Sequence, residues 1–334
     1  MYIIMAFKIC IIGCGNLAFL RHGPSLQKYA AGRNDILLSA CCDIDIKCAE
    51  DFRNEYGFKN SYTSYREMIE TENPDAVCLV VPEGLTAEIA IELLNQKIPV
   101  LMEKPPGINE DEAGKIHKAA GDTPHMVAFN RRHMPIVSEI KKIISKMDVM
   151  RIKCDFYRNE RYDEDFSTTA IHGVDTIKYI ADSQYKNVSL KYQNIKDSVK
   201  NIYLTAEFEN GVTAAIDFCP VSGVHFETIT IVGKNETIIA DLPSGSESNT
   251  TGIISYYKNN ELVFKKDGRD IFGDLSEFEF MGFYEENKIF FDSIISGTAP
   301  ADDVSSCIQS VKIAGLIRDS RERNDYNSEY IDCK

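Results

Sequence analysis

Short apolar runs alternate with amphipathic segments in the first part of the chain. Runs of this length, separated by stretches long enough for a helix, predict parallel strands joined by crossover helices. The predicted strands are Phe7–Ile12, Ile36–Cys42, 75–81 and 98–103. The predicted helices are 47–55, 85–96 and 109–120. The pattern therefore indicates a parallel sheet covered by helices.

The hydrophobic period changes after about Phe129. One amphipathic helix is predicted at Pro135–Ile144, and beyond it apolar and polar positions alternate, as is typical of strands with one buried face. The segment 201–218 predicts two such strands joined by a type I′ turn at Asn210-Gly211.

A second hairpin is predicted at Asn259-Asn260. Helices at 282–296 and 303–320 are expected to close the chain. The second part therefore predicts an antiparallel sheet with helices at its two ends in sequence.

A glycine-rich stretch follows the first strand directly, in "ICIIGCGNLA". Gly13, Gly15 and the small residue Ala18 have the spacing of a dinucleotide-binding loop, in which backbone N–H groups bind a pyrophosphate. The second strand ends in Asp43, an acid placed to accept hydrogen bonds from the adenosine ribose and to repel a 2′-phosphate. We therefore expect NAD in preference to NADP. The alternative for Asp43 is a helix N-cap, and the loop "RHGPSL" explains its unusual distance from the glycines.

The fold class that follows is α/β, with an N-terminal Rossmann NAD-binding domain and a C-terminal α+β domain built on a large, mostly antiparallel open sheet. The chain of 334 residues is long enough for two domains, and the change of period divides it into 1–129 and 130–334. The open face of the second sheet is expected to expose a large apolar patch. We therefore expect a homodimer or homotetramer formed through this sheet.

Composition narrows the classes of partner. The net charge of −14 argues against nucleic acid or an anionic membrane as a partner. The apolar stretch Met1–Ala6 is too short for a signal peptide, and no stretch is long enough to span a bilayer. The ten cysteines form no CxxC pair and no zinc-type spacing, so we expect free thiols, a cytoplasmic protein and no metal site.

One lysine follows an apolar strand in "VLMEKPPG". Lys104 there is either a surface lysine at a strand end or a chemical group. Together, "IIGCGNLA", "DAVCLVVP", "VLMEKPPG", "VAFNRRHMP" and "AIHGVD" resemble the Gfo/Idh/MocA family of oxidoreductases, over about 7–320. The resemblance implies that Lys104 lies at the nicotinamide end of the cofactor and binds the reacting oxygen. It also implies a cis bond between Lys104 and Pro105, and Glu103 is expected to help hold the lysine.

The resemblance assigns the acid/base role to His172, and an imidazole has a pKa suited to that exchange. A histidine that only packs at a helix start is the alternative. Asp175 shares its helical face. Many relatives carry an aspartate where this chain has Thr168, and "RYDED" offers carboxylates nearby. The expected cofactor-binding residues are Gly13, Gly15, Asn16, Leu17, Asp43, Pro82, Glu103 and Lys104.

Arg131 and Arg158 are further candidates near the site, able to hold an anionic group of the substrate, with ion pairing as the alternative. Thr168 and Asp175 complete the expected substrate-binding set. The function expected is an NAD-dependent dehydrogenase or reductase acting on a hydroxyl or carbonyl carbon of a sugar, cyclitol or sugar derivative. Two alternatives stay open: an NAD-binding regulator without turnover, and an enzyme that recycles tightly bound NAD as an oxidant.

Overall fold

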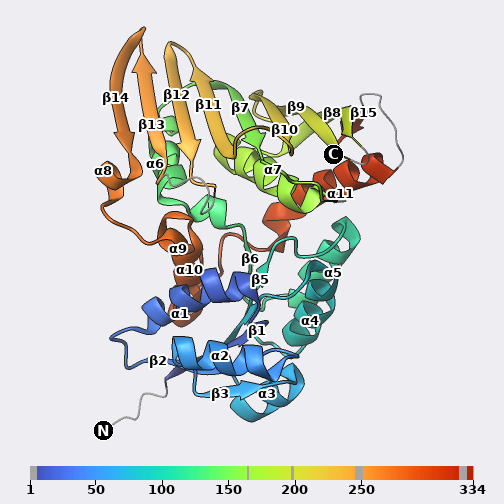
Figure 1. Ribbon diagram of the computed structural model, residues 1–334, viewed down its shortest axis with the longest axis vertical. Coiled ribbons are helices and arrows are strands. Elements are labelled where there is room, and N and C mark those ends of the chain that lie inside the picture. The colour runs from blue at the N-terminus through green and yellow to red at the C-terminus, as the bar shows by residue number, and fades with distance from the viewer. Residues whose placement is uncertain (1–5, 164, 197–198, 245–250, 323–328, 334) are drawn as a thin grey trace. The chain divides into compact units, whose positions relative to one another are not determined.

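The computed structural model describes residues 6–163, 165–196, 199–244, 251–322 and 329–333. The chain divides into two compact units, residues 1–130 with 282–311 and residues 131–281 with 312–334. The sequence placed residues 282–311 in the second domain, whereas in the structure they return to the first unit. Each unit has its own sheet (Figure 1).

The sheet of unit 1 is entirely parallel and has the strand order β3-β2-β1-β4-β5-β6. Its strands are β1 (Phe7–Ile12), β2 (Ile36–Cys42), β3 (Asn60–Tyr62), β4 (Ala76–Leu79), β5 (Val100–Glu103) and β6 (His125–Ala128). Every residue of β4, β5 and β6 is buried. This is why these strands, apart from Glu103 and His125 at strand ends, are apolar runs in the sequence rather than alternating ones.

Helices connect the strands of unit 1. They are α1 (Gly23–Ala30), α2 (Ile46–Tyr56), α3 (Tyr65–Glu72), α4 (Glu83–Asn95) and α5 (Glu110–Ala120), preceded by a π-helical turn η1 (Ala18–His22). The segment "RHGPSL" is helical, so its prediction as an inserted loop was wrong. Pro24 has no N–H to donate to the carbonyl of Leu20, and the helix accommodates it by widening, with the N–H of Gly23 bonded to the carbonyl of Ala18.

The returning segment of unit 1 contains helix α10 (Phe283–Ser296) and the 3-10 turn η3 (Val304–Cys307). Phe290 and Phe291 of α10 are fully buried in the core of this unit. The ring of Phe291 lies 6.3 Å from that of Phe7 and 5.4 Å from that of Tyr29. These aromatic contacts explain why α10 lies beside α1 (Figure 1) although more than half of the chain separates them.

Unit 2 contains the nine-stranded sheet β14-β13-β12-β11-β7-β10-β9-β8-β15. Neighbouring strands are antiparallel except β7 and β10, which are parallel. The strands are β7 (Val149–Tyr157), β8 (Tyr185–Lys196), β9 (Val199–Phe208), β10 (Thr213–Cys219), β11 (Phe226–Gly233), β12 (Glu236–Leu242), β13 (Ile253–Lys258), β14 (Glu261–Asp267) and β15 (Glu329–Asp332). The prediction that helices close the chain was incomplete, because β15 follows the last of them.

Other helices of the second half are η2 (Asn130–His133), α6 (Pro135–Ile144), α7 (Ser167–Ala181), α8 (Gly268–Phe272) and α9 (Glu277–Phe280). Helix α11 (Ile308–Glu322) contains the chain's third passage between the units. Helix α7 packs on β7 and β10. None of the helices in the described ranges is long and apolar enough to cross a membrane.

The two predicted hairpins turn differently. Asn259 and Asn260 both have positive φ, at 51° and 65°, which confirms a type I′ geometry there. At the other hairpin only Gly211 has positive φ, at 86°, so the type I′ prediction for Asn210-Gly211 was wrong. The side chain of Asn210 instead donates to the carbonyl of Ala181 at the end of α7, a contact 2.9 Å long that fixes the turn from outside.

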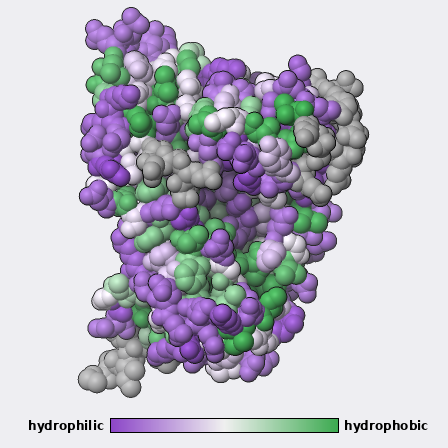
Figure 2. All heavy atoms as spheres, viewed as in Figure 1, coloured by the Kyte–Doolittle hydropathy of each residue, from purple (hydrophilic) through white to green (hydrophobic). Residues whose placement is uncertain are grey.

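The sheet face turned away from α7 is largely polar at its centre. On β7, Ile152, Cys154 and Phe156 are buried, so Lys153 and Asp155 between them project from the opposite face. Lys153 pairs there with Asp155 at 2.8 Å. Hydrophilic and hydrophobic residues are also mixed over β13 and β14 in Figure 2. Lys153 and Asp155 thus interrupt an apolar patch where β7 crosses this face. Self-association through the sheet stays a prediction.

Candidate functional site

The glycine loop of unit 1 borders an open groove of about 500 Å³. A Cβ on Gly13, which has φ of 94°, would lie 1.9 Å from the carbonyl oxygen of Val80, so only glycine fits. A Cβ on Gly15 would meet nothing within 4 Å, so this residue faces open space. The groove therefore has the bare backbone that a pyrophosphate needs for close approach. Its lining includes Ile12, Gly13, Gly15, Asp43, Ile44, Arg66, Pro82 and Leu85.

Asp43 lies at the carboxyl end of β2 and lines this groove. One carboxylate oxygen accepts the N–H of Cys14 at 2.8 Å, and the other accepts the N–H of Asp45 at 3.0 Å. The N-cap of α2 is Asp45, so the N-cap alternative for Asp43 is excluded. The neighbouring Ile44 is 94% exposed, and an apolar side chain left in water at the groove is suited to packing against an adenine ring.

A buried hydrogen-bonded series holds the backbone of Lys104. The Nε2 of His22 lies 2.8 Å from one oxygen of Glu103, and the other oxygen accepts the N–H of Lys104 at 3.1 Å. A carboxylate can only accept, so Nε2 carries the hydrogen. The Nδ2 of Asn287 in α10 lies 3.1 Å from His22 Nδ1. The Lys104-Pro105 bond is cis, which confirms the expectation.

Glu286, next to Asn287, is fully buried beside this series. Within the described part of the chain neither of its carboxyl oxygens has a hydrogen-bond partner. Burial raises the pKa of Glu286 well above its usual range, His22 opposes this rise, and Glu103 and Asp302 add to it. This shift favours the protonated, neutral form of the Glu286 carboxyl.

His172 and Thr168 occupy one face of α7 in unit 2, four residues apart, and both are half-buried. Asp175, on the same helix, is 1% exposed and binds Arg132 through two hydrogen bonds of 2.7 Å and 2.6 Å. The carboxylate of Asp175 is thus engaged in a buried ion pair, and binding a substrate would require it to leave this pair. The sequence did not reveal this partner, since arginines in a "NRRH" run look alike.

Arg131 and Arg158 converge on Glu227 of β11. Arg131 and Glu227 form a bidentate pair, Arg158 binds the same carboxylate, and all three side chains are buried. The guanidinium carbon of Arg158 lies 3.9 Å from the centre of the Phe156 ring. The ion-pairing alternative thus describes both arginines, although the pairing is buried. Nothing in the sequence spacing pointed to Glu227.

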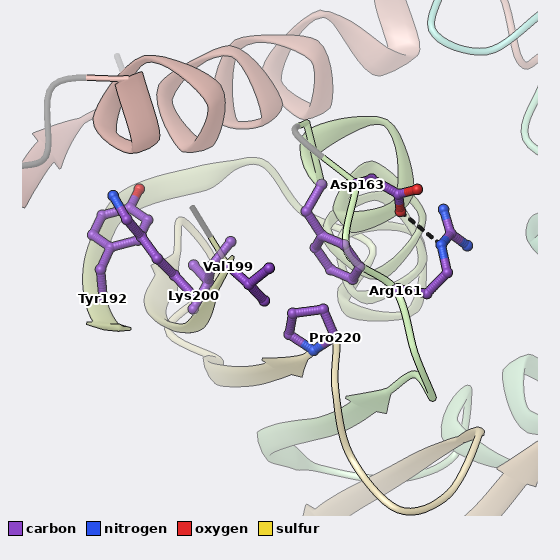
Figure 3. A pocket seen from close by; sticks show the side chains of 8 residues that line it. Arg161, Asp163, Tyr192, Val199, Lys200 and Pro220 are labelled. Atoms are coloured by element: carbon purple, nitrogen blue, oxygen red, sulfur yellow. Dashed lines mark hydrogen bonds and ion pairs between the residues drawn. The ribbon is translucent and has the colours of Figure 1, made fainter. Parts of the chain in front are cut away.

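The acidic loop before α7 borders a very small pocket of about 10 Å³ in unit 2. Figure 3 shows Arg161 and Asp163 turned toward each other, and their side chains are 2.6 Å apart. Asp165 accepts the N–H of Ser167 at 2.8 Å, as an acid at a helix start does. These two carboxylates thus have partners within the unit.

By sequence, the family match to known proteins lies in the first part of the chain. Residues 7–130 match the family described as "Oxidoreductase family, NAD-binding Rossmann fold". Levoglucosan dehydrogenase of Pseudarthrobacter phenanthrenivorans is 33% identical over 106 residues, which are 31% of this chain and 27% of that protein. Inositol 2-dehydrogenase of Corynebacterium glutamicum is 21% identical over 228 residues, which are 64% of this chain and 66% of that protein. The chain spans less than half the length of the first curated relatives it matches.

Solved structures share the fold over the whole chain. A levoglucosan dehydrogenase in complex with NADH has a TM-score of 0.82 at 17% identity and covers 99% of this chain and 100% of its own. An oxidoreductase of Agrobacterium radiobacter, solved with NAD+, L-tartaric acid and magnesium, has a TM-score of 0.81 at 15% identity, with coverages of 98% and 99%. At these identities the likeness shows the fold.

The groove and the two sheets define a Rossmann dinucleotide-binding protein with a second, sheet-based unit. Residues 7–130 match the NAD-binding Rossmann-fold model of the Gfo/Idh/MocA oxidoreductase family. The predicted fold class is thereby confirmed, and the predicted family resemblance is confirmed over these residues.

Proposed function

We propose that the chain is an NAD-dependent dehydrogenase or reductase acting on a hydroxyl-bearing carbon of a sugar, cyclitol or sugar derivative. The observation that carries the proposal is the position of Lys104 directly after β5, at the carboxyl edge of the sheet that also presents the glycine loop. The names of curated relatives, levoglucosan dehydrogenase and inositol 2-dehydrogenase, support the substrate class.

The residues that fit the cofactor are those of the groove. Gly13, Gly15, Asn16 and Leu17 would hold the pyrophosphate through backbone at the start of the helix, and Asp43 would bind the adenosine ribose. Pro82 lines the same groove. When bound, NAD+ supplies the hydride acceptor. Glu103 contributes indirectly, because it holds the backbone of Lys104.

In the proposed reaction each catalytic residue has one task. Lys104 donates a hydrogen bond to the substrate oxygen and stabilises the negative charge that develops there. His172 removes the hydroxyl proton. Bound NAD+ would accept the hydride from the substrate carbon, so that an alcohol becomes a carbonyl while His172 holds the hydroxyl proton. Thr168 lies within a turn of His172 and is proposed to hydrogen-bond the substrate without adding charge.

The experiment is a turnover assay with NAD+ and a panel of sugars and cyclitols, read at the absorbance of reduced nicotinamide. We expect Lys104→Ala and His172→Ala each to lower turnover by about 100-fold or more while NAD+ still binds. Lys115→Ala, which changes an exposed lysine of α5, is the matched control and keeps the wild-type rate. Wild-type turnover in either site variant contradicts the roles. Tight NAD+ binding without turnover on any substrate favours a regulator, and cofactor that copurifies and is never released favours a recycled oxidant.

The preference for NAD over NADP is proposed from Asp43. Its carboxylate at the groove repels a 2′-phosphate. Asp43→Asn keeps an oxygen for the N–H of Cys14 and removes the charge. We expect the ratio of the NADP and NAD dissociation constants to fall by about tenfold in this variant. An unchanged ratio contradicts the preference.

We also propose a reducing, cytoplasmic location. All ten cysteines lie in the described part of the chain, and all are free thiols.

A further inference from the structure

Three potential metal ligands meet at one edge of unit 1, although the sequence predicted no metal site. His117 comes from the last turn of α5, His125 is the first residue of β6, and Asp303 is the N-cap of η3. One ligand atom from each lies within 4.8 Å of the other two. Contacts of η3 with α5 and β6, and the bond from the N–H of Val127 to the carbonyl of Asp302 at 3.0 Å, hold these elements together.

His125 presents an available nitrogen lone pair. Its Nδ1 lies 3.0 Å from the carbonyl oxygen of Thr123, and a carbonyl can only accept, so Nδ1 carries the hydrogen. The Nε2 is then the unprotonated nitrogen. It is buried, and in the described part of the chain it has no hydrogen-bond partner, in a side chain that is only 5% exposed. A histidine whose other N–H is fixed by a backbone carbonyl is the arrangement that orients metal ligands.

Asp303 also has an available ligand atom. Its Oδ1 accepts from the N–H of Ser306 at 3.2 Å and from the hydroxyl of Ser305 at 2.5 Å. These bonds fix the carboxylate, and Oδ2 takes part in none of them. His117 is exposed on α5, with its ring centre 6.4 Å from that of His125. Two ligands are therefore held by the fold, and the third can rotate.

We propose that His117, His125 Nε2 and Asp303 bind a divalent transition-metal ion of the zinc type. Two imidazoles and a carboxylate suit such an ion better than Mg²⁺ or Ca²⁺, which prefer oxygen ligands alone. Bonds of about 2.0–2.2 Å place tetrahedral ligand atoms about 3.3 Å apart. Rotation of the exposed His117 side chain supplies most of this approach, and a solvent molecule completes the coordination.

The proposed ion is structural. His125 begins β6, so the site lies at the amino ends of the parallel strands, whereas the glycine loop and Lys104 follow carboxyl ends at the opposite edge. The ion joins α5, the edge strand and the returning segment that carries η3. The buried group of His22, Glu103 and Glu286 also has ligand atoms within 4.8 Å of one another, but both ring nitrogens of His22 already have partners.

The test is zinc binding by the full chain after removal of metal with a chelator. We expect equilibrium dialysis to show one tightly bound Zn²⁺ per chain and a higher melting temperature when zinc is present. Co²⁺ in the same site should give the visible absorption of a four- or five-coordinate ion. His117→Ala and Asp303→Asn should each weaken zinc binding by about tenfold or more. Circular dichroism confirms that these variants fold, since His117 is exposed and Asn can still cap η3.

Lys118→Ala is the matched control, because Lys118 is the exposed neighbour of His117 in α5. This variant should bind zinc as the wild type does. The proposal is overturned if the wild type binds no zinc, or if it binds zinc equally after either ligand is replaced, which would locate the ion elsewhere.

Discussion

Both units bury acidic groups beside basic ones, but they neutralise them in different ways. In unit 1, Glu286 is buried near Glu103 and one imidazole, and a proton removes its charge. In unit 2, the buried Glu227 lies between Arg131 and Arg158, which stay charged at any physiological pH. The carboxyl of Glu286 can lose its proton as the pH rises, whereas the guanidinium groups beside Glu227 keep their charge. The two regions should therefore respond to pH with opposite sign.

The largest effect is expected from removing the central carboxylate of unit 2. Glu227→Gln leaves two buried guanidinium groups with an uncharged partner, and loss of one member of a buried ion pair costs about 3–5 kcal/mol. Urea unfolding, compared with the wild type at neutral pH, measures this loss. A loss indistinguishable from zero would show that the arginines are neutralised by other groups.

The next effect is the acid sensitivity of the same group. Burial raises the pKa of Glu227, but Arg131 and Arg158 outweigh it and lower the pKa from 4.5 to about 2. The stabilisation is complete above pH 4.5 and is lost as the pH falls from there through about 2, for a total of about 3 kcal/mol. Unfolding curves at about pH 6 and about pH 3 should diverge in the wild type more than in Glu227→Gln. Equal divergence in both would assign the acid sensitivity to other carboxylates.

An effect of opposite sign is expected in unit 1. Because the pKa of Glu286 is raised in the folded protein, the folded state keeps this proton to a higher pH than the unfolded chain, which releases it above the ordinary pKa of 4.5. Stability therefore falls by about 1.4 kcal/mol for each pH unit between these two pKa values. Glu286→Gln removes this loss. The variant should therefore be more stable than the wild type at pH 7, and the difference in stability between the two proteins should be smaller near pH 5. His22, Glu103 and Asp302 face this group, and Glu286→Gln leaves them intact. A variant that is less stable at both pH values would contradict the neutral carboxyl.

The smallest effect is expected at an exposed pair on the sheet of unit 2. Lys186 and Glu207 are 2.9 Å apart, with side chains 47% and 39% exposed. Solvent screens such a pair, so Glu207→Gln should leave the urea midpoint unchanged within error. Replacing Glu by Gln is thus expected to lower stability at the buried Glu227 and to leave it unchanged at the exposed Glu207. A large loss at Glu207 would remove that contrast.

The sequence was most informative where one local rule decides the structure. Strands β1 and β2 have the predicted bounds because interior strands of a parallel sheet are uninterrupted apolar runs. The hairpin at Asn210 was predicted correctly, but its turn type was mispredicted, because a contact with the end of α7 outweighs the local preference for a type I′ turn. Local patterns thus predict elements, while contacts from distant segments correct them.

The candidate site divides in the same way. The glycine loop and Asp43 could be read from spacing, and the structure brings them to one groove. His22, Glu103 and Asn287 could not be joined from the sequence, because they come from three separate segments and follow no period. The roles of Lys104 and His172 rest on the family resemblance and stay predictions.

The wide turn at Ala18–His22 sets the rotational phase of the first helix. Successive residues of a regular α-helix advance by about 100°, and an additional residue in one turn rotates everything beyond it by that amount relative to the start. Because of this rotation, the glycine loop can face its groove while the part of α1 beyond Pro24 turns a different face toward α10. A change at position 24 that restored regular winding would turn one of these faces away from its target, with every contacting side chain still present.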